Sequence, residues 1–236
     1  MTNEKTPGSG PGLSRTKRNV VKNKKLTPRS KDWLNRQIND PFVQQARAEG
    51  WRARAVYKLT QIDDKLKFLT PGKIVVDLGA APGSWTELAV QRIQSLQGKG
   101  KIIALDILEM QPINGAIVIQ KDFTEEDAPE MLFGLLEGKK ADVVLSDMAA
   151  NTTGHRHTDH LRVTYLVELA WDFAKQVLAP NGVFVSKVFQ GGTEAELLKD
   201  LKKYFTKVQH IKPLASRKES PEVYLVATGF KGLSNE

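Results

Sequence analysis

The chain has 236 residues, with 35 Lys and Arg against 27 Asp and Glu, and it contains no cysteine. This length suits one large domain or two small ones, and the absence of cysteine excludes a disulfide scaffold, a thiolate metal site and a cysteine nucleophile. No apolar run approaches the roughly 20 residues that cross a bilayer, and no apolar stretch follows the N-terminal charges. We therefore expect a cytoplasmic protein without membrane association.

The net charge of +8 lies almost entirely at the N-terminus. Residues 1–31 hold nine Lys and Arg and a single acid, whereas the rest of the chain is formally neutral. A segment rich in Gly, Pro, Ser and charged residues buries too little surface to offset its ordering entropy, so residues 1–29 are predicted to be a disordered basic tail. Such a tail suits a polyphosphate partner, because docking releases condensed counterions. A solubilising tail is the alternative.

Three short helices are predicted next. Ser30 is expected to cap the first helix, and Asp40, with Pro41 in the first turn, opens the second. Apolar residues at helical spacing predict a third helix from about Tyr57 to Leu66. These elements form an N-terminal helical extension, residues 30–70, of one domain that covers residues 30–236.

After this extension, strands and helices alternate. Short β-branched runs predict seven strands, at residues 73–78, 101–106, 116–120, 141–147, 182–189, 207–211 and 222–228. Helices are predicted at residues 84–97, 127–136, 160–178 and 194–205, the third of them stopped by Pro180-Asn181-Gly182. Repeated βα units predict an α/β fold with a doubly wound, mostly parallel, Rossmann-like sheet of seven strands, whose last two strands form a hairpin.

Acidic residues stand at or directly after the ends of four predicted strands: Asp77, Asp106, Asp122 and Asp147. Ligands of open α/β sheets bind beyond the carboxyl ends of the strands, so these acids are expected to ring one crevice. The first strand leads into a Gly-rich turn at 79–83 that matches neither G-x-G-x-x-G nor a P-loop. An acid-lined turn of this kind favours an adenosine ligand with a sulfonium over one with a pyrophosphate.

Lys187 lies inside an apolar strand that is expected to be covered on both faces. A lysine there is costly unless it is paired or functional; a lysine that snorkels from the strand end is the alternative. His155, His157 and His160 lack both a thiolate partner and a regular helical offset, so we expect no metal site.

Several motifs, in order and at matching spacing, carry a family resemblance: residues 52–55 (RARA), 57–59 (YKL), 77–85 (DLGAAPGSW), 146–149 (SDMA), 165–170 (YLVELA), 187–191 (KVFQG) and 222–224 (EVY). Over about residues 30–230 the chain resembles the FtsJ/RrmJ (RlmE) family of S-adenosylmethionine-dependent ribosomal RNA 2′-O-ribose methyltransferases. The resemblance implies a class I methyltransferase fold. Two departures, Ser84 in place of a second glycine and Ala150 in place of a proline, affect loop geometry and remove no catalytic group.

The resemblance also implies the roles of particular residues. The family's catalytic tetrad maps onto Lys58, Asp147, Lys187 and Glu222. The implied contacts to S-adenosylmethionine are Gly83, Trp85, Asp106, Asp122 and Asp147. The implied substrate is a uridine ribose in the A-loop of large-subunit ribosomal RNA, within the assembled or nearly assembled subunit, and the enzyme is expected to act as a monomer.

The chemistry of methyl transfer agrees with this mapping. A ribose hydroxyl is a weak nucleophile and needs a base or a strong acceptor nearby, and a lysine can accept its proton only as a neutral amine. RNA contacts are expected from basic residues on the N-terminal helices, although a merely solvated basic face is the alternative: Arg36, Arg47, Arg52 and Arg54.

Two other functions remain open at this stage. A non-catalytic ribosome-assembly factor could use the same fold to bind ribosomal RNA, but it would not need four converging ionisable groups. A nicotinamide-dependent dehydrogenase would need the missing G-x-G-x-x-G. The residues alone define neither the modified nucleotide nor the role of the basic tail.

Overall fold

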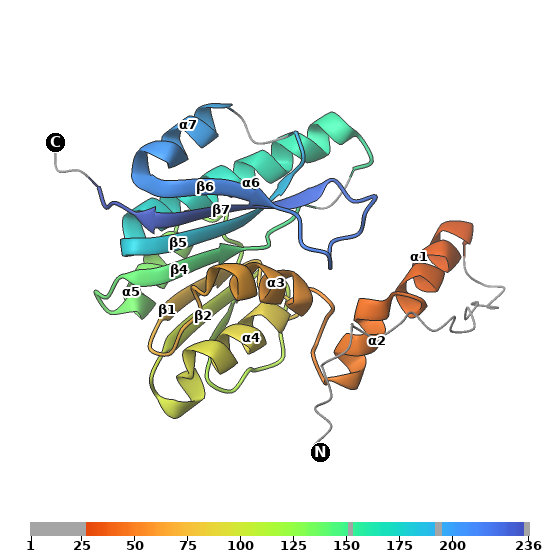
Figure 1. Cartoon of the computed structure of the whole chain (residues 1–236), viewed down its shortest axis with the longest axis horizontal. Coiled ribbons are helices and arrows are strands. Elements are labelled where there is room, and N and C mark those ends of the chain that lie inside the picture. The colour runs from red at the N-terminus through yellow and green to blue at the C-terminus, as the bar shows by residue number, and fades with distance from the viewer. Residues whose placement is uncertain (1–26, 151–152, 192–194, 234–236) are drawn as a thin grey trace, which may run out of the picture. The chain divides into compact units, whose positions relative to one another are not determined.

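A computed structural model describes residues 27–150, 153–191 and 195–233 of the chain (Figure 1). It contains two compact units, Met1–Gln44 and Gln45–Glu236. The predicted basic tail lies outside the described residues except for its last three positions, so its disorder and the single-domain organisation stay predictions. No helix among the described residues is long and apolar enough to cross a membrane.

The first helix begins earlier than the sequence predicts. Helix α1 spans Pro28–Ile38, and its N-cap is Thr27, whose Oγ1 accepts a hydrogen bond of 3.2 Å from the backbone N–H of Ser30. Ser30 therefore lies in the first turn, and the prediction that it caps the helix is wrong. The reason is Pro28, which suits the first helical position because it has no N–H to satisfy.

The second helix begins as predicted. Helix α2 spans Pro41–Ala48, and Asp40 Oδ1 accepts a hydrogen bond of 3.0 Å from the backbone N–H of Phe42. Such an acceptor satisfies one of the N–H groups that the first helical turn leaves without a partner.

The larger unit contains a seven-stranded sheet. Its strands are β1 (Ile74–Leu78), β2 (Lys101–Asp106), β3 (Ile117–Gln120), β4 (Ala141–Ser146), β5 (Leu178–Phe189), β6 (Phe205–Ile211) and β7 (Glu222–Phe230). Their order is β3-β2-β1-β4-β5-β7-β6, and only β7 runs antiparallel to its neighbours β5 and β6. The predicted doubly wound sheet and its closing hairpin are confirmed. The strand order reverses between β1 and β4, the switch point where such sheets bind ligands.

Helices cover both faces of this sheet (Figure 1). They are α3 (Val56–Leu66), α4 (Ser84–Ile93), α5 (Ala128–Leu136), α6 (Arg156–Val177) and α7 (Ala195–Tyr204), with a 3₁₀ turn at Ser95–Gln97. On one face, Trp171 of α6 packs against Phe184 of β5 and Phe205 of β6, with ring centroids 5.9 and 5.4 Å apart. On the other face, Trp85 of α4 packs against Tyr224 of β7 at 5.5 Å. Lys187 is paired with Tyr224 in the β5–β7 register, so its side chain belongs to the α4 face.

Three predicted boundaries are wrong. Helix α4 ends at Ile93 and not at residue 97, because Gln94 adopts a positive φ of 58° and a separate 3₁₀ turn follows. Helix α6 begins at Arg156 and not at residue 160, although it ends at Val177, within one residue of the predicted end.

Strand β5 begins at Leu178 and not at residue 182, so Pro180-Asn181-Gly182 lies within the strand. The β4–β5 register shifts between Ala141 and Val143, and Asn181 has a positive φ of 64°. The register shift leaves the turn-forming residues unpaired within the strand, so the strand continues on both sides of them.

Candidate active site

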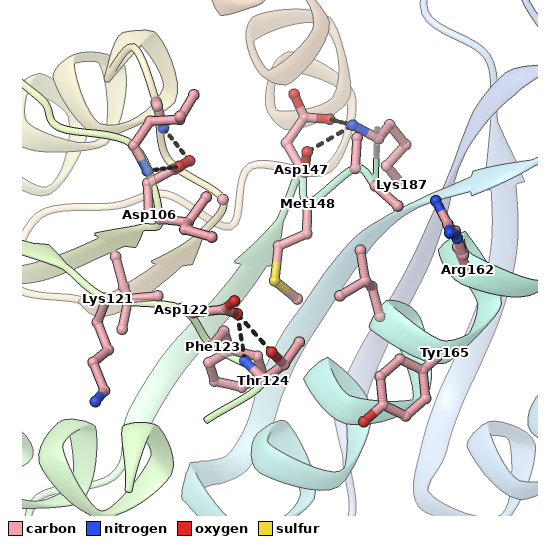
Figure 2. A pocket seen from close by; sticks show the side chains of 18 residues that line it. Asp106, Lys121, Asp122, Phe123, Thr124, Asp147, Met148, Arg162, Tyr165 and Lys187 are labelled. Carbon is pink, nitrogen blue, oxygen red and sulfur yellow. Dashed lines mark hydrogen bonds and ion pairs between the residues drawn. The ribbon is translucent and has the colours of Figure 1, made fainter. Parts of the chain in front are cut away.

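A cavity of about 690 Å³ opens at the carboxyl ends of β1, β2 and β4 (Figure 2). Asp106, Asp122 and Asp147 all line it, and Lys187 reaches it from β5. Three of the four acids predicted from strand ends therefore lie around one crevice at the switch point. The fourth, Asp77, is absent from the lining.

Asp106 joins the two loops that flank one side of the cavity. Its Oδ2 accepts a hydrogen bond of 2.8 Å from Ala81 N–H in the loop after β1, and its Oδ1 accepts one of 2.8 Å from Leu108 N–H in the loop after β2. A carboxylate has about four lone-pair positions, so the side chain can still accept hydrogen bonds from a ligand.

Asp122 lies after β3 on the same side of the cavity. Its Oδ1 accepts hydrogen bonds from the backbone N–H and the hydroxyl of Thr124, at 2.9 and 2.7 Å. These hydrogen bonds, the backbone one first, lower the pKa of the Asp122 carboxyl. The group is therefore an ionised acceptor at neutral pH, next to apolar cavity walls made by Leu108 and Phe123.

Lys187 and Asp147 form a close pair on the opposite side of the cavity (Figure 2). Lys187 Nζ lies 3.2 Å from Asp147 Oδ1 and donates a hydrogen bond of 2.6 Å to the backbone carbonyl of Asp147. The lysine side chain is only 9% exposed. This explains how an apolar strand carries a lysine: the amine is paired and aimed into the cavity, as the sequence anomaly suggested.

Lys58 and Glu222 form a second pair. Lys58 Nζ lies 2.6 Å from Glu222 Oε1, which also accepts a hydrogen bond of 3.1 Å from the hydroxyl of Ser216. Both side chains of the ion pair are 15% exposed. The pair joins helix α3 to the start of strand β7.

Tyr224 connects the two pairs, and sequence reasoning missed it as a site residue. Its hydroxyl donates a hydrogen bond of 3.0 Å to Asp147 Oδ1, and Lys58 Nζ lies 5.8 Å from the centroid of its ring. Burial, followed by the negative charges of Asp147 and Glu222, raises the pKa of the Tyr224 phenol well above its ordinary value. Tyr224 is therefore a permanent hydrogen-bond donor to the site. The available signal was its place two residues after Glu222, which puts both on one face of the strand.

Asp77 is fully buried beneath the site. Its Oδ2 accepts a hydrogen bond of 2.7 Å from Thr86 of α4, and its Oδ1 has no partner among the described residues. Burial raises the pKa of the Asp77 carboxyl to about 7; the charges of Asp147 and Asp106 act in the same direction, and the Thr86 hydrogen bond acts against them. Asp77 therefore supports the first turn of α4 and does not face the cavity.

This pKa predicts a pH dependence of stability. An unfolded aspartate has a pKa of about 3.9, so between about pH 4 and pH 7 the native state binds more protons than the unfolded state, and stability falls as pH rises. Asp77→Asn keeps the acceptor for Thr86 without the charge. We expect its free energy of unfolding, relative to wild type, to increase between pH 5 and pH 7.5 by at most about 3 kcal/mol. Urea unfolding of both proteins across this range measures it; a pH-independent difference would contradict the assignment.

Gly83 and Trp85, which are predicted to contact the cofactor, are not among the residues that line the cavity, and their cofactor contacts stay predictions. Trp85 Nε1 donates a hydrogen bond of 2.8 Å to the carbonyl of Ala55, and its ring packs on Tyr224. Gly83 has a φ of 105°, and a Cβ there would lie 2.6 Å from Ile113 Cδ1. Gly83 is thus the last residue of the loop before α4, and Trp85 joins the first turn of α4 to Ala55 and to Tyr224.

The predicted RNA-binding arginines fall into two groups. Arg36 and Arg47 lie on α1 and α2 with exposed side chains. Arg52 and Arg54 instead donate to the chain itself: Arg54 Nη2 to the carbonyl of Ala215, and Arg52 to three carbonyls and to a carboxylate described below. In the described part of the chain, no group of three or more His, Asp and Glu could hold a metal ion.

The chain is similar to known methyltransferases. Residues 51–230 match the family described as FtsJ-like methyltransferase. The chain belongs to the FtsJ-like methyltransferase family. A relative in Azorhizobium caulinodans, named ribosomal RNA large subunit methyltransferase E, is 58% identical over 203 residues, which cover 86% of this chain and 84% of that protein. A relative of the same name in Paramagnetospirillum magneticum is 55% identical over 236 residues, covering 98% and 96%.

A solved structure shows the same fold. A Plasmodium falciparum protein described as a ribosomal RNA methyltransferase has 32% sequence identity and a TM-score of 0.69, and the match covers 78% of this chain and all of that chain. The cavity described above thus lies at the switch point of a class I methyltransferase sheet.

The methyl donor of this family is S-adenosylmethionine, and the cavity fits it. Asp106 would offer acceptors for ribose hydroxyls, Asp122 would offer one for an adenine amine, and Leu108 and Phe123 would supply apolar walls for a flat ring. When bound, the cofactor supplies an electrophilic methyl group on a sulfonium. Gly79 lets the floor close, since a Cβ there would lie 2.6 Å from the backbone nitrogen of Met148.

Proposed function

We propose that this protein transfers a methyl group from S-adenosylmethionine to the ribose 2′-OH of a uridine in the A-loop of large-subunit ribosomal RNA. The observation that carries the proposal is the placement of Lys187 Nζ. It is held by Asp147 at the wall of the same cavity that Asp106 and Asp122 line. An amine fixed beside an adenosine-type crevice is the arrangement that an alcohol nucleophile needs.

The chain's own groups divide the work of this reaction. Lys187 Nζ would accept a hydrogen bond or the proton from the 2′-OH, and S-adenosylmethionine would supply the methyl group to that ribose oxygen and leave as S-adenosylhomocysteine. Asp147 and Tyr224 fix the direction of that amine, and Glu222 fixes Lys58. In-line displacement depends chiefly on such positioning, because the reacting atoms must be aligned within about 3–3.5 Å.

The cavity extends past the adenosine side to helix α6. Arg162, Tyr165 and Leu166 of α6 line it together with Lys187 (Figure 2). Tyr165 is 52% exposed, which makes its ring available for stacking on a nucleobase. This supports a site that admits a nucleoside splayed out from single-stranded RNA.

The substrate assignment rests on the relatives named ribosomal RNA large subunit methyltransferase E. We propose that the enzyme acts in the cytoplasm as a monomer, on the assembled or nearly assembled large subunit. The basic N-terminal segment would supply the salt-dependent part of this affinity.

Mapping of 2′-O-methyl groups tests the proposed function. Large subunits and protein-free large-subunit rRNA from cells that lack the protein are incubated with it and labelled S-adenosylmethionine. We expect one labelled A-loop uridine, formed on subunits and not on free rRNA. A methyl group elsewhere would replace the substrate assignment. Binding to subunits without any methyl transfer would favour the alternative of a non-catalytic assembly factor.

Asp106 has a predicted effect on cofactor binding. Asp106→Ala removes a charged acceptor for ribose hydroxyls and unties Ala81 from Leu108, so we expect a loss of about 1.5–3 kcal/mol, or at least tenfold in affinity. Calorimetric titration with S-adenosylhomocysteine measures the change. Asp142→Ala, which removes an acceptor bonded to Lys73 and Ile74 away from the cavity, is the control. Unchanged affinity in Asp106→Ala would mean that the crevice is assigned wrongly.

A further inference from the structure

The guanidinium of Arg52 ties together the two loops that flank the adenosine side of the cavity. Its Nη1 donates hydrogen bonds to the carbonyls of Pro82 and Gln111, at 3.2 and 2.8 Å, and its Nη2 donates to the carbonyl of Pro112 at 2.8 Å. Pro82 lies in the loop after β1, whereas Gln111 and Pro112 lie in the loop after β2. One side chain therefore holds three carbonyl groups from two separate loops.

The same side chain is anchored to helix α4. Arg52 Nε lies 2.7 Å from Glu87 Oε1, and the backbone N–H of Arg52 donates a hydrogen bond of 3.3 Å to Glu87 Oε2. With the carbonyl bonds, four of the five guanidinium N–H groups have partners within the chain. A guanidinium used in this way has little capacity left for an RNA phosphate.

The two loops are the same ones that hold Asp106. Ala81, next to Pro82, donates to Asp106 Oδ2, and Leu108 donates to Asp106 Oδ1. Arg52 and Asp106 thus bridge the same pair of loops at different points. Movement of either loop would turn the carboxylate and displace the apolar wall at Leu108, which lines the cavity.

Gly83 gives the arginine its space. A Cβ at this position would lie 3.4 Å from Arg52 Cδ and Nη1, and 2.6 Å from Ile113 Cδ1. Ile113 directly follows Pro112, so the absence of a side chain at Gly83 lets the second loop approach close enough for the carbonyl contacts. The glycine at position 83 and the arginine therefore act together to hold the two loops close to each other.

We propose that Arg52 is a positioning residue for the S-adenosylmethionine site and not a contact for the RNA phosphate backbone. It sets the separation of the loops after β1 and β2, and through them the orientation of Asp106. The proposal rests on the family's cofactor and is independent of which nucleotide is methylated.

A lysine cannot replace Arg52 in this role. Its ammonium is a single point with three donors, so it can pair with Glu87 but cannot span three carbonyls as a planar guanidinium does. Arg52→Lys therefore keeps the positive charge and removes the bridge. This separates a geometric role from an electrostatic one.

The test compares Arg52→Ala and Arg52→Lys with Arg92→Ala in the full-length protein. Arg92 is the matched control, because it also forms ion pairs and its side chain is 22% exposed, against 23% for Arg52. It lies at the C-terminal end of α4, pairs with Asp63 and Asp64 of α3, and is not among the residues that line the cavity. Three quantities are measured for each protein: the Kd for S-adenosylhomocysteine, the unfolding temperature, and the salt dependence of large-subunit binding.

We expect both Arg52 variants to raise the Kd for S-adenosylhomocysteine, and the KM for S-adenosylmethionine, at least tenfold, with subunit affinity and its salt slope as in wild type. Arg92→Ala should lower the unfolding temperature and leave the Kd unchanged. If Arg52→Ala does not fold, Arg52→Lys alone decides. A wild-type Kd in Arg52→Lys, or a salt slope lowered by about one phosphate contact with an unchanged Kd, would overturn the proposal. Wild-type protein that fails to bind S-adenosylhomocysteine would instead refute the proposed function.

Discussion

Lys187→Ala and Lys187→Arg should each lower kcat for methyl transfer by roughly 10²–10⁴-fold, the range expected when a positioned general base is lost. Alanine removes the amine that Asp147 holds in the cavity. Arginine keeps a positive charge, but its guanidinium stays protonated and cannot accept the proton of the 2′-OH. Single-turnover methylation of large subunits, at saturating cofactor, measures the effect.

A binding measurement and a matched control identify the role of Lys187. Both variants should bind S-adenosylhomocysteine with wild-type affinity, because neither substitution touches Asp106 or Asp122. Lys175→Ala is the matched control, since Lys175 is also paired with an aspartate, Asp200, but lies on α6 away from the cavity. Near-normal kcat in Lys187→Arg would exclude proton transfer to the amine and leave an electrostatic role.

Much of the sheet could be predicted from local patterns. Strands β2 and β4 are rich in β-branched residues; an acid ends β2 and another directly follows β4, and parallel strands place those acids at one edge. This is why Asp106 and Asp147 were placed correctly in one crevice. Lys187 could also be predicted as a site residue, because a charged residue inside an apolar strand is unusual and can be recognised without knowledge of its partner.

The roles of Gly83, Trp85 and Arg52 could not be predicted in the same way. Their partners are far along the chain: Trp85 bonds to Ala55, and Arg52 to Gln111. A pattern of residue types shows that an arginine is basic, but not that its donors are already occupied. For the same reason the motif residue Tyr224 was not recognised as the link between two ion pairs.

Helix and strand boundaries were predicted wrongly where a second residue nearby could also cap or end the element. Ser30 is a good N-cap residue, but Thr27 precedes a proline and is the cap. Pro180 and Gly182 are common after helices, yet the β4–β5 register shift places them within a strand span. In both cases a neighbouring backbone requirement decided between two positions of similar propensity.

The second large effect concerns the Lys58–Glu222 pair, which should act as a unit. Lys58→Ala and Glu222→Ala each leave one partly buried charge without its partner at 2.6 Å, so we expect each to lower kcat by about 10²-fold. The double variant should be only slightly slower than either single variant, because the second substitution removes a charge already unpaired. Single-turnover kinetics of the four proteins in a double-mutant cycle give a coupling free energy, which we expect to be about 1–3 kcal/mol.

The contrasting pair is Lys73–Asp142, whose charged atoms lie 2.7 Å apart at the amino ends of β1 and β4, opposite the carboxyl ends at which the cavity opens. The same cycle there should change the free energy of unfolding and leave kcat unchanged. Additive losses of kcat at Lys58 and Glu222 would mean that the two side chains act separately on the substrate. If the coupling appears only in the free energy of unfolding and kcat is unchanged, the pair has a structural role that joins α3 to β7. The proposed catalytic residues would then be Lys187 and Asp147 alone.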